Sequence, residues 1–233
     1  MPSPQLLSLE EIDAPGLSGS PTASAQAAAK DRSGLRRVQL RRKAVLALAI
    51  LGLLGLAAVV EPRMTNPAGL EAFRTLGLTA IFAAIIGRAW CSLYIGGRKT
   101  HEIVDQGPYS LCRNPLYVFS ILAAFGIGAQ TGSLTLALAC SLITLIVLWR
   151  TVLREEAWLR DAFGEPYIAY LSTTPRFAPR WSNWRDQPVL QINPARFVRT
   201  LLDGAVMLAA VPILAALAEA RADGWIATLI ALP

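Results

Sequence analysis

The segment Leu116–Leu148, LYVFSILAAFGIGAQTGSLTLALACSLITLIVL, decides the fold because it holds two apolar runs separated by a short turn. The runs are Leu116–Gln130 and Ser133–Leu148, and each approaches the roughly 17–25 residues that an α-helix needs to cross the hydrocarbon core of a membrane. A turn this short makes two successive helices antiparallel neighbours. The segment is therefore predicted to form a helical hairpin whose two free ends lie at the same membrane face.

Further apolar runs flank the hairpin at Ala44–Val60, Leu76–Ile95 and Leu201–Ala218. Of the 233 residues, 54% are hydrophobic and only 16% are charged, which is the composition of a membrane protein. The sequence predicts an all-α integral membrane protein with about five transmembrane helices. The last apolar piece, Trp225–Pro233, is too short to span and is interpreted as an interfacial or bundle-packed tail.

The distribution of basic residues predicts the orientation in the membrane. Lys30–Lys43 contains seven Lys and Arg immediately before the first apolar run, and such clusters stay on the cytoplasmic side. Five crossings then also place Arg98–Pro115 and Arg150–Arg199 inside, and both are richer in Arg and Lys than the outer loop Glu61–Arg74. The basic cluster is interpreted as a topology signal in contact with membrane lipids, not as a nucleic-acid site.

Four segments follow from this organisation. They are a disordered, basic cytoplasmic tail (1–43), the first two transmembrane helices (44–97), a core with the hairpin (98–180), and an interfacial linker with the fifth transmembrane helix and the apolar tail (181–233). The predicted location is the bacterial inner membrane, with the N-terminus in the cytoplasm.

Two polar clusters that are distant in sequence are predicted to meet at the cytoplasmic end of the hairpin. The first, His101–Tyr117, reads HEIVDQGPYSLCRNPLY, and the second, Leu153–Leu171, reads LREEAWLRDAFGEPYIAYL. Apolar and charged residues alternate in the second cluster at helical intervals, which favours an amphipathic helix at the membrane interface, broken near Gly164.

The residue types in these clusters indicate a binding site for a zwitterion. Asn114 and Pro115 form a natural helix start, since Asn can cap backbone amides and Pro suits the first turn. Uncapped amides beside Arg113 would bind a carboxylate or phosphate, while Glu155 and Glu156 could hold hydroxyls, amines or a cation. Together these groups suit a cofactor with a sulfonium, a carboxylate, ribose hydroxyls and a purine.

A metal centre is not predicted. The chain has three cysteines without CxxC spacing and a single histidine, so neither a zinc site nor a disulfide framework is indicated.

The ordered motif His101-x-x-Val104-x-x-Gly107-Pro108-Tyr109-x-x-x-Arg113-Asn114-Pro115-x-Tyr117, followed by Glu155-Glu156-x-x-Leu159, Phe163-Gly164-x-x-Tyr167-x-x-Tyr170 and Pro175, resembles the isoprenylcysteine carboxyl methyltransferase family. That family is part of a wider group of integral-membrane methyltransferases that includes phospholipid N-methyltransferases. The resemblance covers His101 to Pro179, and the ordered combination is more specific than any single piece.

The resemblance implies a membrane enzyme that uses S-adenosylmethionine and no metal, with a lipophilic or small-molecule methyl acceptor entering from the bilayer. By position, it implies cofactor contacts from His101, Val104, Gly107, Tyr109, Arg113, Asn114, Pro115 and Glu156. The residues expected to orient the acceptor are Arg113, Tyr117, Arg154 and Glu155.

Two departures from the family pattern bear on the acceptor. Many relatives have His at the position of Asn114, and Asn cannot accept a proton at neutral pH, so a carboxylate or thiol is favoured over an amine. Phe119 stands where a Gly is common and is expected to fill space that a prenyl group would use.

The alternatives are a phospholipid N-methyltransferase or an inactive membrane scaffold. A transporter is disfavoured because the sequence shows no repeat.

Overall fold

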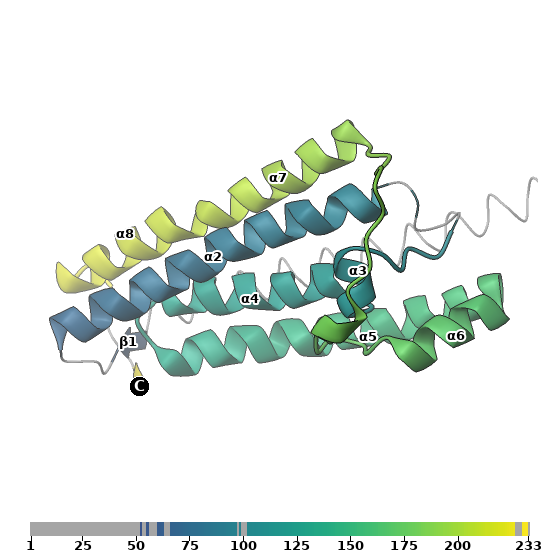
Figure 1. The fold of residues 1–233 in the computed structure, drawn as a ribbon. Helices are drawn as coiled ribbons and strands as arrows, with labels where there is room; N and C mark the ends of the chain where they lie inside the picture. Colours follow the sequence, from purple (N-terminus) through teal and green to yellow (C-terminus); the bar gives the residue numbers. More distant parts are fainter. Residues whose placement is uncertain are drawn as a thin grey trace, which may run out of the picture. The chain divides into compact units, whose positions relative to one another are not determined.

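The structure is a computed structural model that describes residues 52, 55, 60–62, 66–96, 98, 102–226 and 230–232, all within the unit Leu46–Pro233. Its main helices lie side by side, with α7 next to α2, α2 next to α4, and α4 next to α5 (Figure 1). Their bounds are α2 Pro67–Ile95, α4 Pro115–Ala129, α5 Leu134–Phe163 and α7 Pro194–Leu208, and α7 is followed by α8 Ala210–Ala222.

Small residues let α2 and α4 approach closely. A Cβ atom added at Gly77 of α2 would lie 2.7 Å from the Ala129 Cβ, and one added at Gly126 of α4 would lie 2.5 Å from the Gly77 carbonyl oxygen. Such backbone-to-backbone approach is typical of helices that pack in a membrane. Farther along the same interface, the Phe119 ring lies directly over Gly87, so the space that Phe119 fills is the one that this glycine leaves open.

The predicted hairpin is present as α4, a tight turn and α5. Gly132 takes a positive φ of 83° in the turn, which glycine adopts without strain. The Ser133 hydroxyl then accepts a hydrogen bond of 3.3 Å from the Leu136 amide and caps α5. The Gln130 side chain donates to the Arg74 carbonyl at 2.9 Å, which ties the turn to α2.

Three helices are long and apolar enough to cross a membrane: Pro67–Ile95, Leu134–Phe163 and, taken through the join of α7 and α8, Pro194–Ala222. This confirms an all-α arrangement with apolar helices of spanning length. Helix α4 is apolar but has only 15 residues. The predicted tail 1–43, and the predicted span Ala44–Val60 apart from residues 52, 55 and 60, lie outside the described residues, so the number of five crossings stays a prediction.

The segment after the apolar part of α5 differs from the sequence expectation. Residues 150–163 continue α5 without interruption and do not form a separate interfacial helix. The break falls at Gly164, as predicted, where the backbone takes a φ of 61° before α6 (Glu165–Thr173) begins. Helix α5 therefore carries its polar residues rigidly beyond the hairpin.

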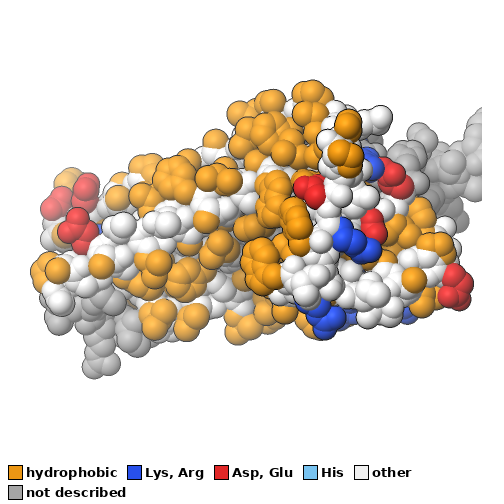
Figure 2. Space-filling view, in the orientation of Figure 1, with side chains coloured by type: hydrophobic (Ala, Val, Ile, Leu, Met, Phe, Trp, Pro, Cys, Tyr) orange, Lys and Arg blue, Asp and Glu red, His pale blue; other side chains and the backbone are white. Residues whose placement is uncertain are grey.

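One end of the helices is polar and holds the short elements α3 (Pro108–Leu111) and η1 (Trp181–Asn183). Residues 174–186 cross α3 and are bound to it by backbone hydrogen bonds, including Arg113 N to Pro175 O and Arg180 N to Leu111 O. Charged side chains gather at the ends of the face shown in Figure 2, with apolar side chains between them.

A short strand pair lies near the start of α2, away from α3. Strand β1 (Val60–Pro62) pairs in parallel with β2 (Ile230–Leu232), so part of the C-terminal apolar tail is a strand. The prediction that this tail lies at the interface or packs against the helices stays a prediction.

Candidate functional site

A groove opens at the polar end of the hairpin and contains about 770 Å³ of unfilled space, including its mouth. The part of this space that can hold water-sized atoms is about 150 Å³. Its walls come from the end of α2, the segment before α3, and helices α3 to α6. The lining residues are Ile95, Glu102, Ile103, Val104, Tyr109, Arg113, Asn114, Leu116, Tyr117, Glu155, Glu156, Leu159, Tyr167 and Tyr170.

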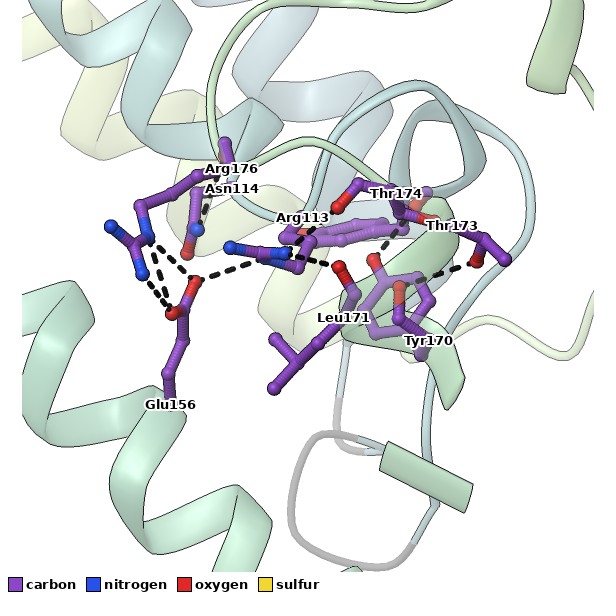
Figure 3. Close-up of polar contacts among 9 residues, drawn as sticks. Arg113, Asn114, Glu156, Tyr170, Leu171, Thr173, Thr174 and Arg176 are labelled. Atoms are coloured by element: carbon purple, nitrogen blue, oxygen red, sulfur yellow. Dashed lines mark hydrogen bonds and ion pairs between the residues drawn. The ribbon is translucent and has the colours of Figure 1, made fainter. Parts of the chain in front are cut away.

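A carboxylate held between two arginines forms one wall of the groove (Figure 3). Glu156 on α5 accepts a hydrogen bond of 3.0 Å from Arg113 Nε. On its other side it accepts from Arg176 Nη2 at 2.8 Å and from Arg176 Nε at 3.1 and 3.2 Å. The Glu156 side chain is only 6% exposed, so these charge-assisted bonds satisfy a carboxylate that would otherwise be costly to bury.

Arg113 is fixed on its far side as well. Its Nη1 donates to the carbonyl oxygens of Leu171, at 2.8 Å, and Thr174, at 2.9 Å, at the end of α6. Its Nη2 makes no hydrogen bond within the described part of the chain. Arg113 thus joins the start of α4, helix α5 and the end of α6, and retains one pair of N–H donors for a ligand.

A second polar pair lines the groove where α4 faces α5. The Tyr117 hydroxyl donates to both carboxylate oxygens of Glu155, at 3.0 and 3.1 Å. Tyr117 is buried against Leu148 and Val152, which fixes its ring. The sequence predicts that these two residues lie together, and the hairpin brings them there.

Three buried tyrosines complete the wall formed by α3 and α6. The Tyr170 hydroxyl donates to the Tyr109 carbonyl at 2.7 Å, and burial raises the pKa of Tyr170. Burial, with Glu156 nearby, raises the pKa of Tyr167 to about 12. Burial also raises the pKa of Tyr109, whose hydroxyl makes no hydrogen bond within the described residues. All three phenols are therefore neutral donors at pH 7.

Asn114 begins α4 differently from the predicted cap. It occupies the N-cap position, but its side chain makes no capping hydrogen bond. Its Nδ2 instead donates to the Arg176 carbonyl at 3.3 Å. The prediction of a helix start at Asn114–Pro115 is confirmed, whereas the side-chain cap is wrong because the amide is used to hold residues 174–186.

The groove collects most of the residues predicted from the sequence. Those that line it are Val104, Tyr109, Arg113, Asn114, Tyr117, Glu155 and Glu156. Gly107 and Pro115 are buried but do not line it: Gly107 has a φ of 56°, and a Cβ there would lie 2.3 Å from the Tyr94 ring. Arg154 is exposed and does not line the groove. His101 lies outside the described residues.

Arg176, Tyr167 and Tyr170 belong to the site but are not predicted as site residues. The two tyrosines stand three residues apart in the resemblance motif, which places them on one helix face, so this spacing could have identified them. The sequence around Arg176 holds no comparable signal, because its partner Glu156 lies twenty residues earlier. Across the described residues, no group of three or more His, Cys, Asp or Glu side chains could hold a metal ion.

A phospholipid methyltransferase family model matches residues 68–166, from the first turn of α2 to the first turn of α6. The nickel-cobalt-cadmium resistance protein NccN of Alcaligenes xylosoxydans xylosoxydans is 36% identical over 162 residues, which are 70% of this chain and 76% of NccN. The cobalt-zinc-cadmium resistance protein CzcN of Cupriavidus metallidurans is 39% identical over 129 residues, or 55% of this chain and 59% of CzcN. No solved structure matches the chain.

The phospholipid methyltransferase model thus covers helices α2 to α5, which include two of the three described helices that are long and apolar enough to cross a membrane. The chain belongs to the family of NccN, of which it covers about three quarters. The wider methyltransferase group indicated by the sequence is thus supported, but the matching model describes its phospholipid branch and not the isoprenylcysteine carboxyl branch.

Proposed function

We propose that the protein is an integral-membrane methyltransferase that uses S-adenosylmethionine and methylates a lipophilic or small acceptor. One observation carries the proposal: two polar segments about forty residues apart, which lie within the matched residues 68–166 except for Tyr167 and Tyr170, line a single groove at one end of an apolar hairpin. The membrane location follows from the three long apolar helices, and the basic inner segments favour the cytoplasmic side of a bacterial inner membrane.

The groove residues fit S-adenosylmethionine, which supplies an electrophilic methyl group on a sulfonium when bound. Arg113 Nη2 can donate to the carboxylate of S-adenosylmethionine. The neutral Tyr109 hydroxyl is a buried donor without an acceptor among the described residues, and a bound ligand would supply that acceptor. Glu155 and the faces of Tyr167 and Tyr170 suit its positive charges. Glu156 is predicted to contact the cofactor, but both of its oxygens are bound by arginines, so its role is to orient Arg113.

The protein residues would act by binding, orientation and exclusion of water. Arg113 donates three hydrogen bonds, to the Glu156 carboxylate and to the carbonyl oxygens of Leu171 and Thr174. Its orientation is therefore fixed before a ligand arrives. Preorganised groups of this kind lower a barrier without moving during the reaction. The apolar Leu116 and Leu159 exclude water from the same space.

The acceptor predicted from sequence is a carboxylate or thiol, because Asn114 cannot act as a base. The charges of the groove favour a second candidate, an amine of the phospholipid type. Of its described lining residues, Glu102 pairs with Arg98, and Glu156 pairs with Arg113 and Arg176, so this candidate rests on the third carboxylate, Glu155. Glu155, with Tyr117 bound to it, could receive the proton that an ammonium must lose before methylation.

The names of NccN and CzcN connect those two proteins to resistance against nickel, cobalt, zinc and cadmium. By analogy, this chain would methylate a component of the membrane, and the methylated component would contribute to metal tolerance. A host strain that depends on the protein for growth with cobalt should then lose tolerance with Glu155→Gln and keep it with Asp161→Asn, an exposed carboxylate on the same helix.

Product analysis tests the reaction. The purified full chain is incubated with methyl-labelled S-adenosylmethionine and three acceptors in turn: phosphatidylethanolamine, a prenylcysteine carboxylate and an alkyl thiol. Label is expected in one product, with loss in Glu155→Gln and retention in Asp161→Asn. No label in any product, from protein that binds S-adenosylhomocysteine, would instead support the inactive scaffold.

A further inference from the structure

A cationic and aromatic patch lies on the side of Glu156 that faces away from the groove. The Arg176 guanidinium carbon lies 5.1 Å from the centre of the Trp149 ring. The Trp149 ring stacks on Phe177, with ring centres 5.6 Å apart and an angle of 29° between their planes. Arg176 does not line the groove. The patch, Arg176, Trp149 and Phe177, does not itself line the groove, but it contacts three residues that do: Glu156, Asn114 and Tyr117.

The position of this patch corresponds to the membrane–water boundary. Trp149 directly follows the apolar run of α5 and directly precedes Arg150, and its side chain is 42% exposed. Phe177 packs against the cluster of Tyr117, Leu148 and Val152, which lies where α4 begins. Tryptophan with neighbouring arginine is the usual composition at the level of lipid headgroups.

The patch also carries an excess of positive charge. Glu156 is shared by Arg113 and Arg176, so the three side chains together have a net charge of +1. Arg176 is the most exposed of the three side chains, at 30%, and its Nη1 makes no hydrogen bond within the described residues; in Figure 3 one nitrogen of its guanidinium group has no dashed line. An arginine whose plane is fixed by an aromatic ring is well prepared to bind phosphate oxygens.

We propose that Arg176, Trp149 and Phe177 form a binding site for the phosphate of an anionic phospholipid at the membrane surface, apart from the methylation groove. The lipid phosphate neutralises the excess charge through Arg176, and its acyl chains follow the exposed apolar side of α5 on the membrane side of Trp149, which includes Leu142 and Ile146.

The site has a consequence for the groove, and this part rests on the proposed function. A phosphate that binds Arg176 competes with Glu156 for the same guanidinium, and it strengthens the hold of Glu156 on Arg113. Anionic lipid is therefore expected to lower the affinity of the groove for a carboxylate that Arg113 binds, because it adds negative charge beside that arginine.

A lipid titration of the full chain in a neutral detergent tests the site directly. The thermal midpoint is followed as phosphatidylglycerol, phosphatidylcholine or inorganic phosphate is added. Phosphatidylglycerol should raise the midpoint in the wild type and in Arg180→Gln, an exposed arginine four residues along the same segment. In Arg176→Gln the half-saturating lipid concentration should rise about tenfold, as expected for the loss of a charge-assisted contact.

Three results would overturn the proposal: equal responses of the two arginine variants, an equal rise with phosphatidylcholine, or an equal rise with inorganic phosphate. If Arg176→Gln does not yield folded protein, Arg176→Lys retains the charge and should keep the preference for phosphatidylglycerol with weaker binding. Titration with S-adenosylhomocysteine, with and without phosphatidylglycerol, tests the coupling. If S-adenosylhomocysteine does not bind at all, the cofactor assignment is refuted. The thermal shift with phosphatidylglycerol still tests the lipid site by itself.

Discussion

The apolar α2–α4 interface and the polar end of the hairpin both hold α4 in place, but they do so by opposite means. Between α2 and α4, glycines bring backbones into contact, and no charged pair is needed at Gly77 and Gly126. At the polar end, Glu156 binds two arginines, and Arg113 binds two backbone carbonyls. The first region depends on shape and the second on charge.

This difference explains where chemistry can occur. A shape-matched interface has no space for a ligand, since even one methyl group at Gly77 would collide with Ala129. The charged end leaves a groove and several donors whose geometry is already fixed. The same contrast gives stability predictions of graded size.

The largest effect is expected for Glu156→Gln, which removes the shared carboxylate and leaves the Arg113 charge buried. Losing one partner of a buried ion pair costs about 3–5 kcal/mol, and the neutral amide recovers part of this through hydrogen bonds. Thermal midpoints in detergent measure the change, with Asp161→Asn as the exposed control on α5. Equal midpoints for the two variants would show that the polar end does not depend on this charge.

Gly77→Ala tests the region that depends on shape. Its Cβ would lie 2.7 Å from the Ala129 Cβ and 2.9 Å from the Gly126 carbonyl oxygen, so the helices must separate. Overpacking of this kind typically costs about 1–3 kcal/mol. Gly52→Ala is the matched control, since a Cβ at Gly52 meets nothing within 4 Å. A midpoint as high for Gly77→Ala as for Gly52→Ala would contradict close packing of α2 and α4.

Gly164→Ala separates backbone conformation from crowding. A Cβ at Gly164 would meet no atom within 4 Å, but the φ of 61° is unfavourable for alanine. The expected loss is about 1 kcal/mol or more, because a φ of 61° with a ψ of −136° is a backbone conformation that residues with a Cβ rarely adopt. The measurement is again the thermal midpoint. A rise in midpoint would mean that α5 and α6 can join into one continuous helix.

The smallest effect is expected from the ionisation of Tyr167. Burial raises its pKa from 10.0 to about 12, so the folded state holds the phenolic proton more tightly than the unfolded state does. The stabilisation is complete below pH 10 and is lost as the pH rises towards 12. Tyr167→Phe cannot ionise and should lose less stability over this interval. Parallel loss in both proteins would assign the alkaline transition to other groups.

Much of the fold follows from local sequence signals. The short turn between two apolar runs predicts the hairpin, and the hairpin alone brings Tyr117 to Glu155. The break at Gly164 follows from the glycine itself. The continuity of α5 was also available from the sequence, because Leu134–Phe163 contains neither Gly nor Pro, but the start of charged residues at Arg150 suggested a new element.

The remaining features depend on how the helices rotate against one another. The contact of Phe119 with Gly87 joins residues on two helices whose relative depth no local pattern specifies. The bonds from Arg176 to Glu156, and from Asn114 to the Arg176 carbonyl, require the path of residues 174–186 over α3. Long-range contacts of this kind are set by tertiary packing and not by residue spacing.

Calorimetric titration of the detergent-purified chain with S-adenosylhomocysteine, in the wild type and in Tyr109→Phe, tests the central claim that the groove holds the cofactor. The Tyr109 hydroxyl has no hydrogen-bond partner within the described residues, so its removal should leave the thermal midpoint unchanged. The account predicts saturable binding by the wild type and affinity about tenfold weaker in Tyr109→Phe. Folded wild-type protein that shows no saturable binding would contradict it.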